Sequence, residues 1–217
     1  MDCGGNMKIS DNIYWLDSAK GKRAGNIYLV VDDEITLIDT GFPGSWEKVT
    51  NDMLSIGIQA RQVKNILLTH YDIDHMGNAS KLQELTNAEL WASKEDIPVI
   101  QGKEDRKGFK RFFKYLFHVE PPKNINILVP GRTFNNIKVL FTPGHTPGHL
   151  CFMYKKYLFA GDLLENKNGA LLPYPSMWNW DNSLVRASLQ EISKYDIETV
   201  CPGHGNPVAW STFKTSK

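Results

Sequence analysis

Short apolar runs alternate with longer amphipathic stretches along most of the chain. The short runs are typical of β-strands, and the longer stretches place apolar residues at helical spacing. We expect strands at Ile13–Leu16, Asn26–Val31, Ile35–Ile38, Val63–Leu68, Glu89–Ala92, Ile127–Val129, Ile137–Phe141, Leu150–Tyr154, Tyr157–Ala160 and Thr199–Cys201. We expect helices at Ser45–Ser55, Met76–Leu85, Asp105–Phe117 and Ser183–Lys194. This order predicts an α/β sandwich in which two sheets pack face to face with helices outside.

The length and composition fit one folded unit. The chain has 217 residues, of which 41% are hydrophobic, enough to build a sizeable core without disulfide bonds. No linker rich in Gly, Ser or Pro divides the sequence, so we expect a single domain over residues 7–217. Residues 1–6 precede a second methionine, Met7, and we expect them to form a disordered extension.

Charge and cysteine content narrow the class of protein. Lys and Arg number 25 and Asp and Glu 24, so the net charge is +1 and we expect no nucleic-acid or membrane partner. The chain has three cysteines without a C-x-x-C motif, which favours a reducing compartment over a disulfide framework. The first thirty residues contain no long apolar run of the kind found in signal peptides. We therefore expect a cytoplasmic protein.

Histidine and aspartate side chains follow the ends of four predicted strands. These residues are His70, Asp72, Asp74 and His75 after the first of these strands, then His145, Asp162 and His204 after three later ones. Taken singly, a His or Asp at a strand end is most often a turn or cap residue. Four such ends in one chain instead indicate a functional site, because side chains that carry chemistry gather where rigid strands pass into loops.

The spacing of these residues predicts two neighbouring metal sites. Side chains alternate in an extended segment, so His70 and Asp72 can serve one ion while Asp74 and His75 serve a second. His145 would complete the first set and His204 the second, with Asp162 placed to bridge them. Imidazole and carboxylate ligands without a thiolate suit zinc, iron or manganese. We therefore expect one or two divalent ions per chain, with zinc favoured.

The same residues resemble the signature of the metallo-β-lactamase superfamily. Its motif H-x-H-x-D-H is followed by distant His, Asp and His residues, and the chain matches it from His70 to His204 with Asp72 in place of the middle His. The resemblance covers roughly residues 12–208. It implies a four-layer αβ/βα sandwich of two mixed β-sheets, with a metal site at the sheet edges. Asp72 makes the identity of the ion at the first site an open question.

The resemblance also implies a reaction. A metal-bound or bridging hydroxide would attack a small ester, thioester, lactone or related substrate, and Asp74 would orient this nucleophile and carry its proton. One alternative is an iron-dependent oxidoreductase of the same fold, because a carboxylate at position 72 favours iron or manganese. A second alternative is a hydrolase that processes nucleic acid, which the near-neutral charge disfavours.

Several further residues have candidate roles. The resemblance places Asp39 beside the metals, and His149 is expected to orient neighbouring groups rather than to bind metal. Trp178 and Trp180 follow Asp162 in a Pro- and Trp-rich loop that either lines the substrate pocket or fills an edge of the core. The basic stretch 103–117 has one apolar helical face. It is expected to be a solvated surface helix, a lid over the site or a homodimer contact.

Overall fold

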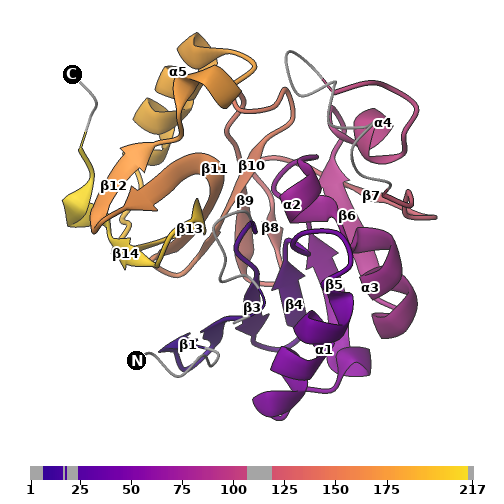
Figure 1. Cartoon of the computed structure of the whole chain (residues 1–217). Helices are drawn as coiled ribbons and strands as arrows, with labels where there is room; N and C mark the ends of the chain where they lie inside the picture. The colour runs from indigo at the N-terminus through magenta and orange to yellow at the C-terminus, as the bar shows by residue number, and fades with distance from the viewer. Residues whose placement is uncertain (1–6, 17, 19–23, 107–118, 215–217) are drawn as a thin grey trace.

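The first half of the chain forms one seven-stranded sheet (Figure 1). The computed structural model describes residues 7–16, 18, 24–106 and 119–214. The strands lie in the order of the sequence: β1 (Met7–Ser10), β2 (Ile13–Trp15), β3 (Tyr28–Val31), β4 (Ile35–Ile38), β5 (Val63–Leu67), β6 (Glu89–Ser93) and β7 (Asn126–Leu128). Neighbours from β1 to β4 are antiparallel and those from β4 to β7 are parallel, so the sheet is mixed.

The second half forms another mixed sheet. Its strands are β8 (Thr133–Phe134), β9 (Ile137–Phe141), β10 (Leu150–Tyr154), β11 (Tyr157–Lys167), β12 (Ala170–Pro173), β13 (Thr199–His204) and β14 (Val208–Ala209). The order is β14-β13-β11-β10-β9-β8, and β12 pairs with β11. The contact between β11 and β13 is parallel, whereas the hairpins on either side of it are antiparallel. This pairing places the ends of β11 and β13 side by side.

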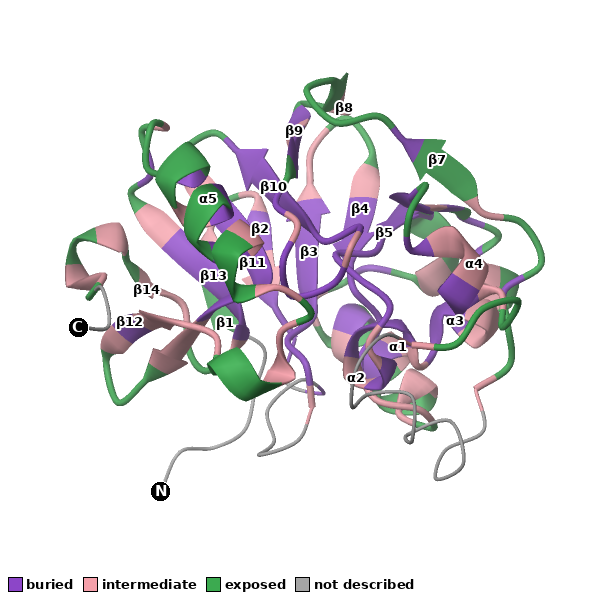
Figure 2. Ribbon diagram, turned by 90° about the horizontal axis from the view of Figure 1, so that it is seen from above, coloured by how far each residue is buried: buried purple, intermediate pink, exposed green. Residues whose placement is uncertain are grey.

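Helices cover the outer faces of both sheets. They are α1 (Trp46–Ser55), α2 (Ile73–Met76), α3 (Ala79–Thr86), α4 (Ile97–Ile100) and α5 (Asn182–Ile192), with short 3₁₀ turns at η2 (Ala60–Gln62), η4 (Ser176–Trp178) and η5 (Trp210–Thr212). Helix α3 packs on β5 and β6, and α5 packs on β11 (Figure 1). The outward faces of these helices are exposed, whereas the strands between them are buried (Figure 2). The predicted αβ/βα sandwich is therefore confirmed.

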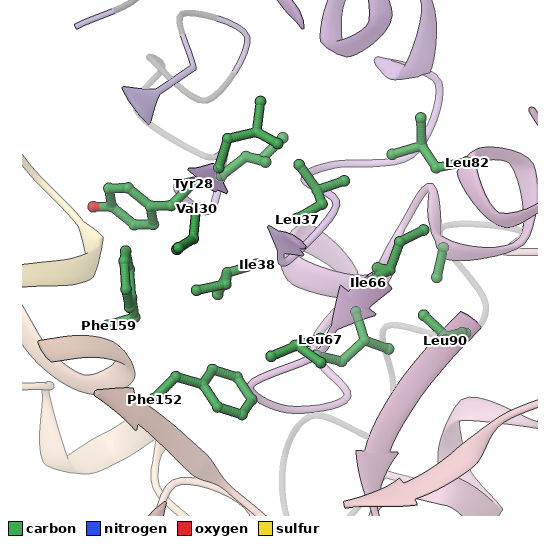
Figure 3. Close-up of a cluster of buried hydrophobic side chains, with 14 of the residues drawn as sticks. Tyr28, Val30, Leu37, Ile38, Ile66, Leu67, Leu82, Leu90, Phe152 and Phe159 are labelled. Atoms are coloured by element: carbon green, nitrogen blue, oxygen red, sulfur yellow. The ribbon is translucent and has the colours of Figure 1, made fainter. Parts of the chain in front are cut away.

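The main core lies between the two sheets. Phe152 and Phe159 of the second sheet face Tyr28 and Ile38 of the first (Figure 3), and the rings of Tyr28 and Phe159 are 5.4 Å apart. These side chains are at most 2% exposed. A fully buried side chain of this size contributes about 1.5–3 kcal/mol relative to an exposed one, so this layer holds the two sheets together.

The structure differs from the sequence prediction at one helix. The helix expected over Met76–Leu85 starts three residues earlier and is divided into α2 and α3. At the break, the side-chain amide of Asn78 donates to the carbonyls of Thr40 and Phe42 at 2.7 and 2.8 Å. These tertiary hydrogen bonds tie the break to the loop after β4, and helical periodicity alone carries no signal for them.

Several short strands were not predicted, and two predicted segments lie wholly or mostly outside the described residues. Strands β1, β8, β12 and β14, which are two to four residues long, are not among the expected strands. The expected extension 1–6 and most of the expected helix Asp105–Phe117 lie outside the described residues. Within the described residues, no helix has both the length and the apolar character needed to cross a membrane.

Candidate metal centre

The first ligands of the centre lie in the loop after β5. Hydrogen bonds to Asp39 hold Thr69, which precedes His70 in this loop. The backbone N–H and the hydroxyl of Thr69 both donate to the Asp39 carboxylate, at 2.8 and 2.7 Å. The hydroxyl oxygen of Thr69 also lies 2.9 Å from Nδ1 of His70. Because the hydroxyl hydrogen is already used, Nδ1–H of His70 must be the donor in this contact. The lone pair on Nε2 of His70 is therefore available to a metal ion.

The first cluster gathers around His145, which lies in the loop between β9 and β10. Its Nε2 is 3.1 Å from the Asp72 carboxylate and 3.4 Å from Oδ2 of Asp162. Nε2 of His70 is 3.6 Å from Asp72 and 3.9 Å from Oδ2 of Asp162. The donor atoms of these four residues all lie within 4.8 Å of one another. They can hold a single ion.

The second cluster lies directly beside the first. Asp72 precedes α2, so the chain turns into a helix and directs Asp74 and His75 to a different point from Asp72. Nε2 of His204 is 3.2 Å from the Asp74 carboxylate, and Nε2 of His75 is 3.8 Å from it. The donor atoms of Asp74, His75 and His204 lie within 4.8 Å of one another, so they too can hold an ion.

Asp162 joins the two clusters through its two carboxylate oxygens. Oδ1 lies 3.2 Å from Nε2 of His75 and 3.4 Å from Nε2 of His204, both in the second cluster. Oδ2 faces His70 and His145 of the first. A carboxylate with one oxygen toward each cluster has the geometry of a ligand shared by two ions.

Buried atoms without hydrogen bonds show that the residues fit divalent ions. Within the described part of the chain, Nε2 of His70, His75 and His204 and Oδ1 of Asp162 are buried and make no hydrogen bond. Leaving a buried polar atom without a partner costs on the order of 1–3 kcal/mol. Metal ions would supply a partner to each of these atoms, and nitrogen and oxygen donors are the types that zinc, iron and manganese bind.

The charges of the clusters differ when no ion is bound. Burial, with help from the nearby His75, lowers the pKa of His70 to about 4, so its imidazole is neutral. Burial also lowers the pKa of His204, but Asp162 and Asp74 outweigh it and raise that pKa to about 10. Asp162, Asp39 and Asp74 likewise raise the pKa of His75 well above its usual value against the effect of burial. The second cluster is therefore a set of ion pairs that must release protons when it binds a metal.

Hydrogen bonds at Nδ1 fix the orientation of the His75 and His145 imidazoles, as the contact with Thr69 does for His70. Nδ1 of His75 is 2.8 Å from the Asp39 carboxylate, and Nδ1 of His145 is 3.0 Å from the amide oxygen of Asn179. Partners of this kind hold the ring so that Nε2 points at the metal. Asp39 thus contacts His75 and the start of the loop that carries His70, and its role beside the metals remains a prediction.

His149 contacts the backbone next to Asp162 rather than either cluster. Its Nε2 accepts a hydrogen bond from the Asp162 backbone N–H at 3.1 Å, and its Nδ1 lies 2.9 Å from the Thr142 hydroxyl. Burial lowers the pKa of His149 well below its usual value, so the ring stays neutral and Nε2 remains an acceptor. His149 therefore contacts the backbone beside Asp162, and its orienting role remains a prediction.

We expected Asp162 to follow the end of a strand, but it lies within β11. That strand continues to Lys167, and its register with β13 shifts around Gly161. Gly161 has a positive φ of 47°, and a Cβ there would lie 2.7 Å from Nε2 of His149. The resulting irregularity turns the Asp162 side chain into the centre. His204 is similarly the last residue of β13, which extends past the predicted Cys201.

Two further side chains, Tyr174 and Arg106, lie close to the clusters. The ring of Tyr174 lies 5.0 Å from that of His145 and 5.5 Å from that of His204. Arg106 is half-buried, and burial lowers its pKa while Asp72 and Asp74 oppose this effect. Sequence reasoning missed Thr69, Asn179 and Tyr174, although Tyr174 stands in the Pro- and Trp-rich loop after Asp162. Arg106 belongs to the basic stretch 103–117, for which a lid over the site was one of three expectations.

The predicted pocket residues lie in the same loop. Trp178 ends η4 and is half-buried, and Trp180 is 46% exposed. The backbone N–H of Trp180 donates to the carbonyl of His145 at 3.2 Å, so this loop runs beside the first cluster. A role in binding substrate remains a prediction.

Known proteins are similar to this chain in sequence. The family model described as the metallo-beta-lactamase superfamily matches residues 21–204. The chain is 28% identical over 198 residues to the uncharacterized protein YobT of Bacillus subtilis, covering 83% of this chain and 82% of the relative. It is 32% identical over 161 residues to the hydroxyacylglutathione hydrolase GloC of Haemophilus influenzae, covering 64% of this chain and 66% of that relative.

A solved structure is similar to this chain in fold. TTHA1623, determined in a di-iron-bound form, superimposes with a TM-score of 0.72 at 25% sequence identity, covering 89% of this chain and 94% of that one. The family match spans most of the sequence and includes all seven residues of the two clusters. The chain therefore belongs to the metallo-β-lactamase superfamily and is a metal-dependent hydrolase of that family.

Proposed function

We propose that the protein hydrolyses small acyl thioesters or esters at a centre that holds two divalent ions. The observation that carries this proposal is the position of Asp162, whose two oxygens face different His/Asp clusters at 3.2–3.9 Å. The relative GloC is named a hydroxyacylglutathione hydrolase. Its substrate is an acyl group on a thiol, which supports the thioester class.

The bound ions would acidify a water molecule and polarise the scissile carbonyl. Asp74 is suited to handle the proton of that water, because its side chain is 24% exposed and lies beside His204 at 3.2 Å. Against the effect of burial, His75 and His204 lower the pKa of Asp74, so it is ionised and ready to accept a proton. The side chains of Asp72 and His204 are also partly exposed, at 15% and 20%, and define the side from which substrate enters.

The reaction needs only water and the acyl substrate. The water oxygen forms a bond to the carbonyl carbon, and Asp74 accepts a proton from that water. The carbonyl electron pair moves onto its oxygen and then returns, so that the bond to the leaving sulfur or oxygen breaks. The leaving group keeps the electron pair of that bond and receives the proton held by Asp74.

A substrate panel tests this proposal. Protein loaded separately with zinc, manganese or ferrous iron would be assayed with a hydroxyacyl thioester of glutathione, a phenyl ester, a lactone and a phosphodiester. We expect turnover of the acyl substrates, and a fall in kcat of about 100-fold or more in Asp74→Asn. Asp32→Asn is a matched control, because that carboxylate binds Tyr154 and Asn136 away from the centre. Absence of acyl turnover in every metal-loaded form would refute the proposal.

Asp72 supports a second candidate, an iron-dependent redox reaction. Its carboxylate lies 3.1 Å from His145 in the first cluster, and oxygen donors favour iron and manganese more than imidazole does. The structural neighbour TTHA1623 has been determined in a di-iron-bound form. Oxygen consumption by the iron-loaded protein with a reductant, together with no acyl turnover, would favour this candidate over hydrolysis.

A further inference from the structure

Tyr174 is held rigidly at the junction of the two clusters. It directly follows β12, and its backbone N–H donates to the carbonyl of Leu163 at 3.2 Å. Leu163 is the neighbour of Asp162 in β11, so Tyr174 is tied to the strand that carries the shared carboxylate. This hydrogen bond therefore ties Tyr174, the first residue of the loop after β12, to the edge of the sheet.

The ring of Tyr174 spans both clusters. Its edge-to-face contact with His145 lies in the first cluster, at 5.0 Å and 89°, and its tilted contact with His204 lies in the second, at 5.5 Å and 32°. Burial, together with the charges of Asp162, Asp74 and Asp72, raises the pKa of Tyr174, so its hydroxyl lies near these carboxylates. The polar end of this half-buried side chain thus points at the centre from its open side.

A phenol in this position can donate a hydrogen bond where the reaction takes place. The hydroxyl of tyrosine is protonated at neutral pH and both donates and accepts. Asp72, Asp74 and Asp162 are acceptors when ionised, and the metal-facing nitrogens would be occupied by ions. Tyr174, whose ring contacts a histidine of each cluster, can therefore donate to an oxygen that gains negative charge between them.

We propose that Tyr174 is a catalytic residue whose hydroxyl donates a hydrogen bond to the carbonyl oxygen of the substrate as water adds to the carbonyl carbon. This inference rests on the proposed function. The hydroxyl keeps its proton throughout: the carbonyl electron pair moves onto the oxygen, accepts the hydrogen bond and returns when the bond to the leaving group breaks. A donor aimed at such an oxyanion typically changes kcat by about 100- to 1,000-fold.

The variant Tyr174→Phe removes only the hydroxyl and keeps the ring contacts with His145 and His204. We expect kcat for a phenyl ester to fall by about 100-fold, with KM within about twofold of wild type. The metal content per chain should stay unchanged. The matched control is Tyr154→Phe, which removes a hydroxyl that binds Asp32 outside the centre, and its kcat should equal that of wild type.

Binding of a phosphonate gives a second readout that needs no turnover. Methylphosphonate carries the charged oxygens of a tetrahedral intermediate, and calorimetry with the metal-loaded protein measures its affinity. We expect Tyr174→Phe to weaken this binding by about tenfold or more, and Tyr154→Phe to leave it unchanged. Wild-type kcat and phosphonate affinity in Tyr174→Phe would overturn the inference. So would a loss of metal in that variant, because Tyr174 would then support Asp162 instead of contacting substrate.

The results that would refute the proposed function differ from those that would refute the role of Tyr174. If the wild-type protein turns over none of the acyl substrates, hydrolysis is refuted, while phosphonate affinity still reports whether Tyr174 donates to a tetrahedral oxyanion. If wild-type protein hydrolyses the ester and Tyr174→Phe does so equally fast, the inference fails and the proposed function stands.

Discussion

At the scale of single residues, Asp72 is the feature that most distinguishes this centre. Its carboxylate lies 3.1 Å from Nε2 of His145 and 3.6 Å from that of His70. The resemblance to the family signature predicts an imidazole at this position. A carboxylate adds a negative charge and an oxygen donor to the first cluster. Both changes favour harder ions and make a bound water less acidic than at a site richer in imidazole.

Exchange of Asp72 for the family's histidine should change metal preference. We expect Asp72→His to retain more zinc relative to iron and manganese than wild type, and to move the midpoint of the pH–rate profile lower. Asp72→Ala should lose the first ion and keep the second, which Asp74, His75 and His204 bind. Competition between equal concentrations of the three metals, followed by elemental analysis, measures this. Wild-type metal content and activity in Asp72→Ala would show that Asp72 is not a ligand.

Arg106 is a second single residue of interest, because its positive charge lies near the carboxylates of Asp72 and Asp74. Its Nε is buried and makes no hydrogen bond to any described residue. We expect Arg106→Gln to raise KM about 5- to 10-fold for an anionic thioester and to leave KM for a neutral phenyl ester unchanged. The effect should shrink as salt concentration rises. Equal changes in KM for both substrates would exclude a role in recognising charge.

At the scale of elements, sequence patterns predicted the strands and the residues that follow them, but not the irregular backbone. His70, His145 and His204 could be placed together because each follows an apolar run that must be a buried strand. The position of Asp162 inside β11 depends on the positive φ of Gly161, and the break between α2 and α3 depends on contacts with a distant loop. Tyr174 and Asn179 come from a loop without periodicity, so only the folded structure shows their contacts.

The junction of α2 and α3 offers a stability test. A Cβ at Gly77 would lie 2.4 Å from the carbonyl oxygen of Ile73 and 2.4 Å from Cδ of Pro43. We expect Gly77→Ala to destabilise the protein by about 3 kcal/mol, because backbone atoms must move. Gly57→Ala is the control: Gly57 has a φ of 81° and open space around it, so its cost should be about 1 kcal/mol. Urea unfolding measures both, and equal costs would mean that the close packing at Gly77 is easily relieved.

At the scale of the whole molecule, the centre is assembled from both sheets. His70, Asp72, Asp74 and His75 follow β5 of the first sheet, whereas Asp162 and His204 lie in the second. Asn26 joins the two beside the centre, since its side-chain amide donates to the carbonyls of Pro202 and Gly205 at 2.9 and 2.6 Å. Relative movement of the sheets would therefore separate the two sets of ligands.

The ion pairs of the second cluster should make the metal-free protein sensitive to alkaline pH. The pKa of His204 is raised to about 10 from an unfolded value near 6.5, so its contribution to stability is complete below pH 6.5. That contribution is lost as pH rises through 10. We expect the free energy of unfolding of the chelator-treated protein to fall by about 4 kcal/mol between pH 6.5 and 10. His204→Ala should show a smaller fall, and an identical fall in that variant would exclude His204 as the cause.

The central claim is that two clusters share Asp162 and hold two ions. Elemental analysis of metal per chain, on protein saturated with manganese and then desalted, tests it most directly. We predict two ions in wild type, about one in His145→Ala and about one in His204→Ala, because each variant loses a ligand of only one cluster. The Asp162→Asn variant should retain less than either. Two ions in every variant, or the same loss of both ions in His145→Ala and His204→Ala, would contradict the account.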